Sequence, residues 1–201
     1  MTPRRARISL QRKIQFQLHN VVAPGLGQAY VPPPETILMG TVMIFHLSIA
    51  AQNPERAARA IAEIWGGEAT VFPPYDGAWV ALAGDDRNSL IEVYPLGTEL
   101  APADGMDDAQ GVINLAPSRS TATHAAIATH LTEAQVRNIA ARHGWTCKTL
   151  SRGGMFHVIE FWIEAAIMIE VLTEAFQQEY LKSMTLDGWK SFLADVGAAA
   201  A

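Results

Sequence analysis

The sequence contains an internal repeat, because residues 46–93 align with residues 124–171 without a gap at an offset of 78 positions. Twelve of the 48 aligned positions are identical. The identical pairs include His46 with His124, Gly66 with Gly144, and Glu92 with Glu170. A repeated segment of this length is typical of a structural unit used twice. The sequence therefore predicts two modules of one design joined by a linker.

Each module shows the pattern β-α-β-β-β. In the first, Asn53 and Pro54 are suited to the start of a helix, and Gly66 to its end. Apolar residues recur at helical spacing between them, and β-rich apolar runs flank the helix. The strands are expected at 42–50, 68–72, 77–83 and 88–95 in the first module. In the second they are expected at 122–129, 146–151, 155–163 and 166–173, with the helix running from Thr132 to Gly144.

These patterns divide the chain into five parts: a basic N-terminal extension (1–41), the first module (42–95), a linker (96–121), the second module (122–173) and a helical tail (174–201). The linker contains Asp104-Gly105 and two prolines, which favour a loop. The tail is expected to hold helices at 174–184 and 186–196. A stripe of Trp189, Phe192 and Leu193 is expected to be buried in the second.

Charge and composition exclude several classes of protein. The 201 residues carry a net charge of −5, which makes the chain as a whole a poor binder of nucleic acid. No apolar run approaches the ~20 residues of a membrane span. Cys147 is the single cysteine, so an intrachain disulfide is impossible. The expected location is the cytoplasm, the default compartment for a chain without disulfides.

The N-terminal extension differs in charge from the rest. Residues 1–34 hold five basic residues and no acidic one, whereas the remaining residues carry a net charge of −10. Apolar side chains recur at even spacing through residues 8–18, namely at Ile8, Leu10, Ile14, Phe16 and Leu18. This spacing predicts a strand or arm ordered against the protein or a partner subunit. The alternative is a leader with no role in the fold.

Two histidines and two glutamates recur at equal spacing. His46 and His124 lie in the first strand of each module, and Glu92 and Glu170 follow 46 residues later in the last strand. Strand alternation places each glutamate on the same face as apolar neighbours, where a carboxylate needs a partner or a metal. Two imidazoles and two carboxylates suit one divalent metal, whether Zn, Ni, Fe, Mn or Co. Glu160, Glu164 and His157 are weaker candidates for this site.

The motifs Phe45-His46-Leu47-Ser48-Ile49, Leu90-Ile91-Glu92-Val93, Thr123-His124-Ala125-Ala126-Ile127 and Met168-Ile169-Glu170-Val171 resemble those of the vicinal oxygen chelate superfamily. That group includes glyoxalase I, extradiol dioxygenases and bleomycin-resistance proteins. The resemblance implies an α+β fold in which two βαβββ modules form a curled mixed sheet around a metal cleft. It is nearest to metal-dependent glyoxalase I. No recognisable glutathione-contacting set accompanies it.

Three functions follow as hypotheses. The first is a metal-dependent lyase or isomerase that moves a proton next to a carbonyl, with Glu170 as the base implied by the resemblance and Glu92 as its counterpart. The second is an Fe(II) extradiol-type dioxygenase. The third is a non-catalytic, resistance-type protein that binds a small molecule. In each case the expected partner is a small molecule, and a homodimer is expected because such sheets leave edges to cover.

Overall fold

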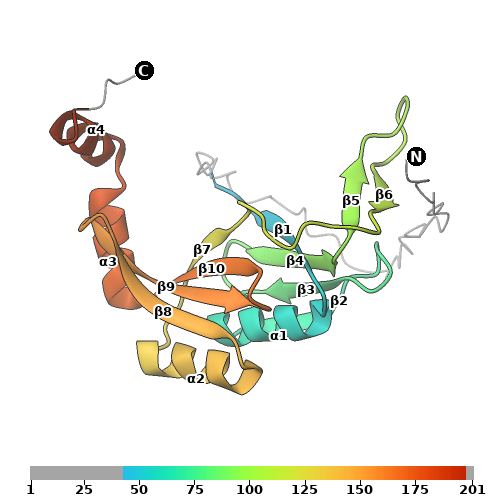
Figure 1. The fold of residues 1–201 in the computed structure, drawn as a ribbon, viewed down its shortest axis with the longest axis horizontal. Coiled ribbons are helices and arrows are strands. Elements are labelled where there is room, and N and C mark those ends of the chain that lie inside the picture. The colour runs from blue at the N-terminus through green and yellow to red at the C-terminus, as the bar shows by residue number, and fades with distance from the viewer. Residues whose placement is uncertain (1–42, 198–201) are drawn as a thin grey trace, which may run out of the picture.

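The computed structural model describes residues 43–197, which form two βαβββ modules, a hairpin between them and a helical tail (Figure 1). The predicted extension 1–41 and its predicted strand lie outside the described residues. The first module comprises β1 (His46–Ala51), α1 (Pro54–Trp65), β2 (Glu68–Val71), β3 (Trp79–Leu82) and β4 (Leu90–Pro95). The second comprises β7 (Ala125–Ala128), α2 (Glu133–His143), β8 (Thr146–Arg152), β9 (Phe156–Ile163) and β10 (Ile167–Leu172).

Both helices begin and end at the residues that the sequence indicates. The Asn53 side chain accepts a hydrogen bond from the backbone N–H of Arg56 at 3.0 Å, and Pro54 is the first residue of α1. Thr132 and Gln135 form a capping box at the start of α2. Gly66 and Gly144 follow the two helices with φ of 72° and 68°, the left-handed conformation that glycine adopts without strain.

The two sheets have the same topology. In the first module the order is β1-β4-β3-β2, with β1 parallel to β4 and the other pairs antiparallel. In the second it is β7-β10-β9-β8, with the same directions. The predicted α+β fold with two βαβββ modules is confirmed. The modules form two separate four-stranded sheets rather than one continuous curled sheet.

The linker contains a structure that the sequence analysis missed. Residues 96–121 were expected to form a loop, but β5 (Thr98–Ala101) and β6 (Gln110–Ile113) pair as an antiparallel hairpin. Asp104 and Gly105 lie in the turn that joins the two strands, where Gly105 has a φ of 66°. The turn residues were recognised, whereas the four-residue strands on either side are too short to stand out by periodicity.

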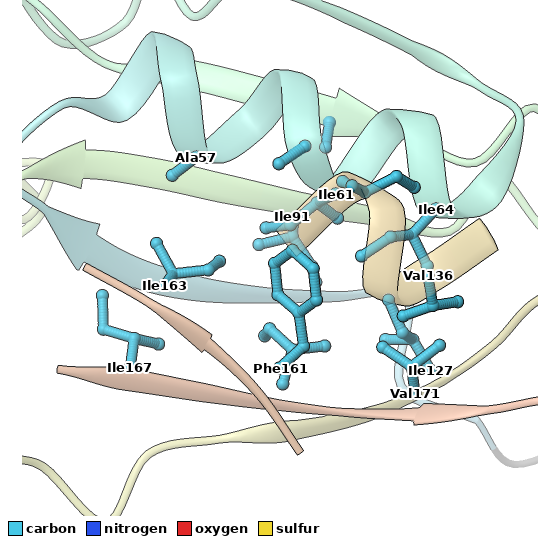
Figure 2. Packing of buried hydrophobic residues seen from close by; sticks show 14 of the residues in the cluster. Ala57, Ile61, Ile64, Ile91, Ile127, Val136, Phe161, Ile163, Ile167 and Val171 are labelled. Carbon is cyan, nitrogen blue, oxygen red and sulfur yellow. The ribbon is translucent and has the colours of Figure 1, made fainter. Parts of the chain in front are cut away.

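One hydrophobic core joins the two modules (Figure 2). Ile61 of α1 and Ile91 of β4 face the fully buried ring of Phe161 from β9. Val136 of α2 completes this contact region, and α1 packs against α2. Polar contacts cross the same boundary, since Arg56 Nε donates to His143 Nδ1 at 2.9 Å and Arg142 pairs with Glu63. The two modules are therefore parts of a single packed body.

The tail forms α3 (Glu174–Ser183) and α4 (Leu186–Asp195), close to the expected ranges. Phe176 of α3 is buried against the second module. The expected burial of Trp189, Phe192 and Leu193 was wrong, because no residue of α4 is buried and Trp189 is 41% exposed. The physical reason is that α4 lies against α3, at the far end of the molecule from the first module (Figure 1). None of the helices between residues 43 and 197 is long and apolar enough to span a membrane.

Candidate functional site

The open face of each sheet, which is the face turned away from that module's helix, carries the predicted glutamates. In the first module, Ile49 and Val93 belong to the core, so alternation places Ser48 and Glu92 on the open face. These two residues are direct neighbours across the β1–β4 pair. Ser48 Oγ donates to Glu92 Oε2 at 2.8 Å, and the Tyr94 hydroxyl donates to the same oxygen at 3.2 Å.

Tyr94 is held in its neutral, donating form. Burial raises the pKa of Tyr94 to about 12, and the neighbouring Glu92 carboxylate adds to the rise through its charge and hydrogen bond. Edge-to-face contacts with Phe72 and Tyr75 fix the ring at centroid distances of 6.0 and 5.2 Å. Glu92 is therefore a carboxylate whose hydrogen bonds come from its own module.

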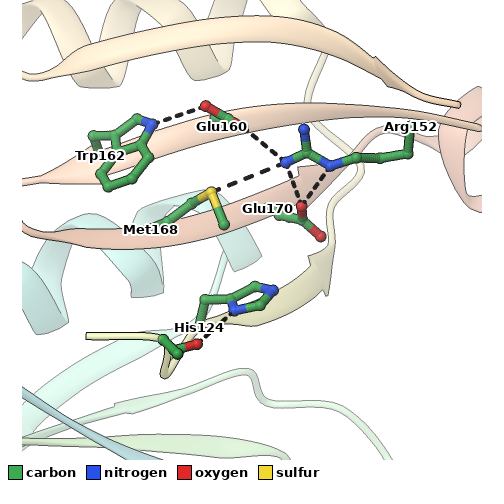
Figure 3. A network of polar contacts seen from close by, with 7 residues as sticks. His124, Arg152, Glu160, Trp162, Met168 and Glu170 are labelled. Atoms are coloured by element: carbon green, nitrogen blue, oxygen red, sulfur yellow. Dashed lines mark hydrogen bonds and ion pairs between the residues drawn. The ribbon is translucent and has the colours of Figure 1, made fainter. Parts of the chain in front are cut away.

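In the second module, Glu170 is paired with an arginine (Figure 3). Arg152, the last residue of β8, reaches Glu170 Oε1 with Nε at 2.9 Å and with Nη2 at 2.5 Å. The same Nη2 lies 2.8 Å from Glu160 Oε1. Glu160 Oε2 in turn accepts a hydrogen bond from Trp162 Nε1 at 3.0 Å. One guanidinium therefore lies between two carboxylates that face each other across β9 and β10.

The electrostatics of this group favour the charged forms. Burial opposes charge on Arg152, but the hydrogen bonds and charges of Glu160 and Glu170 outweigh it and raise its pKa above the ordinary value. Burial likewise opposes charge on Glu160. Its hydrogen bonds from Trp162 and Arg152 outweigh that effect and lower its pKa. Glu170, the other carboxyl group that Arg152 contacts, is only 8% exposed.

The two predicted histidines line a different region. His46 and His124 both border a cavity of about 720 Å³, here called the histidine cavity, which is lined by residues of β1 and β7 and also by Trp65 and Tyr180. His124 Nδ1 is 2.9 Å from the carbonyl oxygen of Ala122. Neither Glu92 nor Glu170 lines this cavity.

The structure therefore does not bring the four predicted metal ligands together as one set of donors. Across residues 43–197, no group of three or more histidine, cysteine, aspartate or glutamate side chains is placed to hold a metal ion. Glu92 and Glu170 each use a carboxylate oxygen on protein donors. The four-ligand site stays a prediction.

A second cavity, of about 420 Å³, lies where the first module, the hairpin and the linker meet. We call it the hairpin cavity. Its wall includes Ser48 and Tyr94 from the open face and Arg119 from the linker, with Ile167 contributed by the second module. Thr98 of β5 also lines it, and the Oγ1 atom of Thr98 is buried without a hydrogen-bond partner.

Other polar residues that the sequence singled out have structural partners. Glu164 accepts hydrogen bonds from the backbone N–H groups of Gln52 and Asn53 at 2.7 and 2.9 Å, across the two modules. His157 Nδ1 lies 2.9 Å from Glu179. Burial raises the pKa of the Cys147 thiol, which disfavours the reactive thiolate.

Sequence reasoning missed Arg152. The repeat aligns Arg152 with Pro74, so a comparison of the two modules offered no counterpart. The signal that could have found it is strand pairing, since a basic residue at the end of β8 can reach acidic residues on the neighbouring strand β9 and on β10 beyond it.

No family model matches this chain, and no curated protein is similar to it. Solved structures that are similar include the fosfomycin resistance protein FosX from Mesorhizobium loti, at 12% identity and a TM-score of 0.44, covering 69% of this chain and 98% of that one. Another is lactoylglutathione lyase from Agrobacterium tumefaciens, at 11% identity and a TM-score of 0.44, covering 65% and 92%. A third is the trypanothione-dependent glyoxalase I of Leishmania major, at 14% identity and a TM-score of 0.39, covering 79% and 100%. At these identities the likeness concerns the fold alone.

Proposed function

We propose that this protein binds a small organic molecule in the hairpin cavity without the help of a metal ion. The observation that supports this most directly is that the carboxylates of both open faces are held by protein donors. Ser48 and Tyr94 hold Glu92, and Arg152 holds Glu170. The half-buried guanidinium of Arg152 supplies at Glu170 the positive charge that a metal would supply elsewhere. This corresponds to the third hypothesis from the sequence, a non-catalytic binding protein.

The hairpin cavity has the size and lining of a small-molecule site. Its volume of about 420 Å³ falls within the range of ligand pockets, ~300–1,000 Å³. Its wall combines apolar side chains such as Leu96 and Ile167 with polar ones such as Ser118 and Arg119. The two modules and the hairpin all contribute residues, as expected for a site at the junction of structural units.

A ligand screen on metal-free protein tests this function. The full chain, treated with EDTA and desalted, is screened against a small-molecule library by thermal shift, and hits are measured by calorimetry. We expect at least one ligand whose affinity is the same with and without EDTA. Ala50→Phe, which fills the hairpin cavity, should lower the affinity for that ligand by about tenfold or more. Ala128→Phe, in the histidine cavity, is the matched control and should leave the affinity for the ligand unchanged.

A second candidate function is favoured by a separate observation, namely that His46 and His124 line one cavity. We propose it as a metal-dependent lyase or isomerase in which these histidines, with Glu92 and Glu170, bind one divalent ion. Elemental analysis of the purified full chain separates the two functions. A content close to one Zn, Ni, Fe, Mn or Co ion per chain, which His46→Ala abolishes, supports the metal-dependent enzyme. A content well below one ion per chain in both proteins supports metal-free binding.

A further inference from the structure

Within residues 43–197, β1 and β7 are edge strands of their sheets, as are β2 and β8 at the opposite edges. In residues 43–197, β1 pairs with β4 alone and β7 pairs with β10 alone. The backbone N–H of Thr129 donates to the carbonyl of Leu172. Because alternate residues of a parallel strand point their backbone groups to opposite sides, the N–H groups of Ala126 and Ala128 point away from β10. Within residues 43–197, no strand pairs with the donors and acceptors on this edge of β7.

Neither edge carries the features that normally protect one. Natural sheets guard an exposed edge with charged side chains, proline or a bulge. The β1 segment His46–Ala51 and the β7 segment Ala125–Ala128 contain no lysine, arginine, acidic residue or proline. Ala126 and Ala128 are exposed, and their small side chains leave room for a neighbouring strand. An edge of this kind is suited to pairing with a further strand.

The histidine cavity borders this edge. Every residue from His124 to His130 lines the cavity, as do residues 44–47 next to and within β1. Side chains from both faces of a strand can line the same cavity only where the strand presents its edge. The wall also contains apolar Trp65 and acidic Asp85, and Phe45 beside it is 62% exposed. The cavity is therefore an apolar space with a free strand edge on one side.

We propose that the segment Ile14-Gln15-Phe16-Gln17-Leu18 of this same chain binds in the histidine cavity as a strand paired with β7. Its strict alternation places Ile14, Phe16 and Leu18 on one face, which would cover the apolar wall. Arg12 and Lys13 precede it in a region without acidic residues, complementary to a remainder with a net charge of −10. The 25 residues between Leu18 and Ile44 are ample to reach the cavity, at roughly 3.3 Å each when extended.

Hydrogen exchange of single backbone amides in the full chain tests this proposal. In the parent protein we expect the amides of Ala126 and Ala128 to be protected. Phe16→Asp should speed their exchange by about tenfold or more, because a charge would then face the apolar wall. Gln17→Asp, on the opposite face of the same segment, is the matched control and should change the exchange rates of Ala126 and Ala128 little. The amide of Ile127, which points to β10, should be unaffected in every variant.

Addition of a synthetic peptide of residues 10–20 to the Phe16→Asp protein should restore protection at Ala126 and Ala128. Two outcomes would overturn the proposal. One is rapid exchange at both amides in the parent protein, which would show that nothing pairs with this edge. The other is protection that survives Phe16→Asp and rises with protein concentration, which would assign the edge to a second copy of the chain.

Discussion

Arg152 links the two acidic residues of the second open face, and its removal would leave both without their cation. The side chains of Glu160 and Glu170 are 15% and 11% exposed, and Arg152 is 28% exposed. We expect Arg152→Met to lower the free energy of unfolding by about 2–4 kcal/mol, somewhat below the value for a fully buried pair. Urea denaturation measures this. Arg137→Met, which breaks an exposed ion pair with Glu133, is the control and should change the free energy of unfolding by less than about 1 kcal/mol.

The same group predicts how stability depends on pH. The pKa of Glu160 is lower in the folded protein than its ordinary value of 4.5. Such a carboxyl group stabilises the fold above pH 4.5, and this contribution is lost as pH falls through the folded-state pKa. The destabilisation caused by Arg152→Met should therefore be larger at pH 7 than at pH 3. Equal destabilisation at both pH values would show that the guanidinium acts through packing rather than charge.

At the scale of elements, Glu164 couples the second module to the start of α1. Its carboxylate accepts hydrogen bonds from the backbone N–H groups of Gln52 and Asn53, next to the N-terminus of the helix. Glu164→Ala should destabilise the protein by about 1–2 kcal/mol, as loss of a helix cap does. Because Glu164 has a φ of 55°, Glu164→Asn is the informative comparison, since asparagine tolerates that backbone and keeps one acceptor. An alanine variant as stable as the parent would exclude this capping role.

Most elements could be predicted from the sequence because each has local signals. Asn53, Pro54 and Gly66 bound α1, and the repeat confirmed each assignment with a second copy. The hairpin of the linker lacked that support, since residues 96–121 have no counterpart in the repeat. The burial of Trp189 was predicted wrongly because helical periodicity shows which face is apolar but not whether a partner covers it.

The candidate site was harder to predict for a related reason. The repeat identified Glu92 and Glu170 as equivalent, and alternation placed each on a face with apolar neighbours, which the structure shows to be the face turned away from the helix. Their partners are not equivalent, since Ser48 and Tyr94 hold one and Arg152 holds the other. A comparison of modules reports what they share, so it could not show that each carboxylate had acquired its own donors.

At the scale of the whole molecule, the sequence predicts a homodimer on the ground that sheet edges need covering. Within residues 43–197, β2 and β8 are edge strands outside the histidine cavity, so pairing of residues 14–18 with β7 would leave them open. We therefore expect the full chain to associate through such an edge, with a molar mass near twice the 21.8 kDa of one chain by light scattering at micromolar concentration. A mass of one chain at that concentration would contradict the prediction.

The shared core predicts that the two modules unfold together. Phe161 of the second module is fully buried and faces Ile61 and Ile91 of the first (Figure 2). Phe161→Ala should destabilise the protein by about 3–5 kcal/mol, because it leaves a cavity at this junction. Exchange of backbone amides in β3 and in β9 should accelerate by the same factor, since one cooperative unit contains both strands. Acceleration confined to β9 would show that the first module keeps its structure when the second opens, and that the packing seen between them does not make them one folding unit.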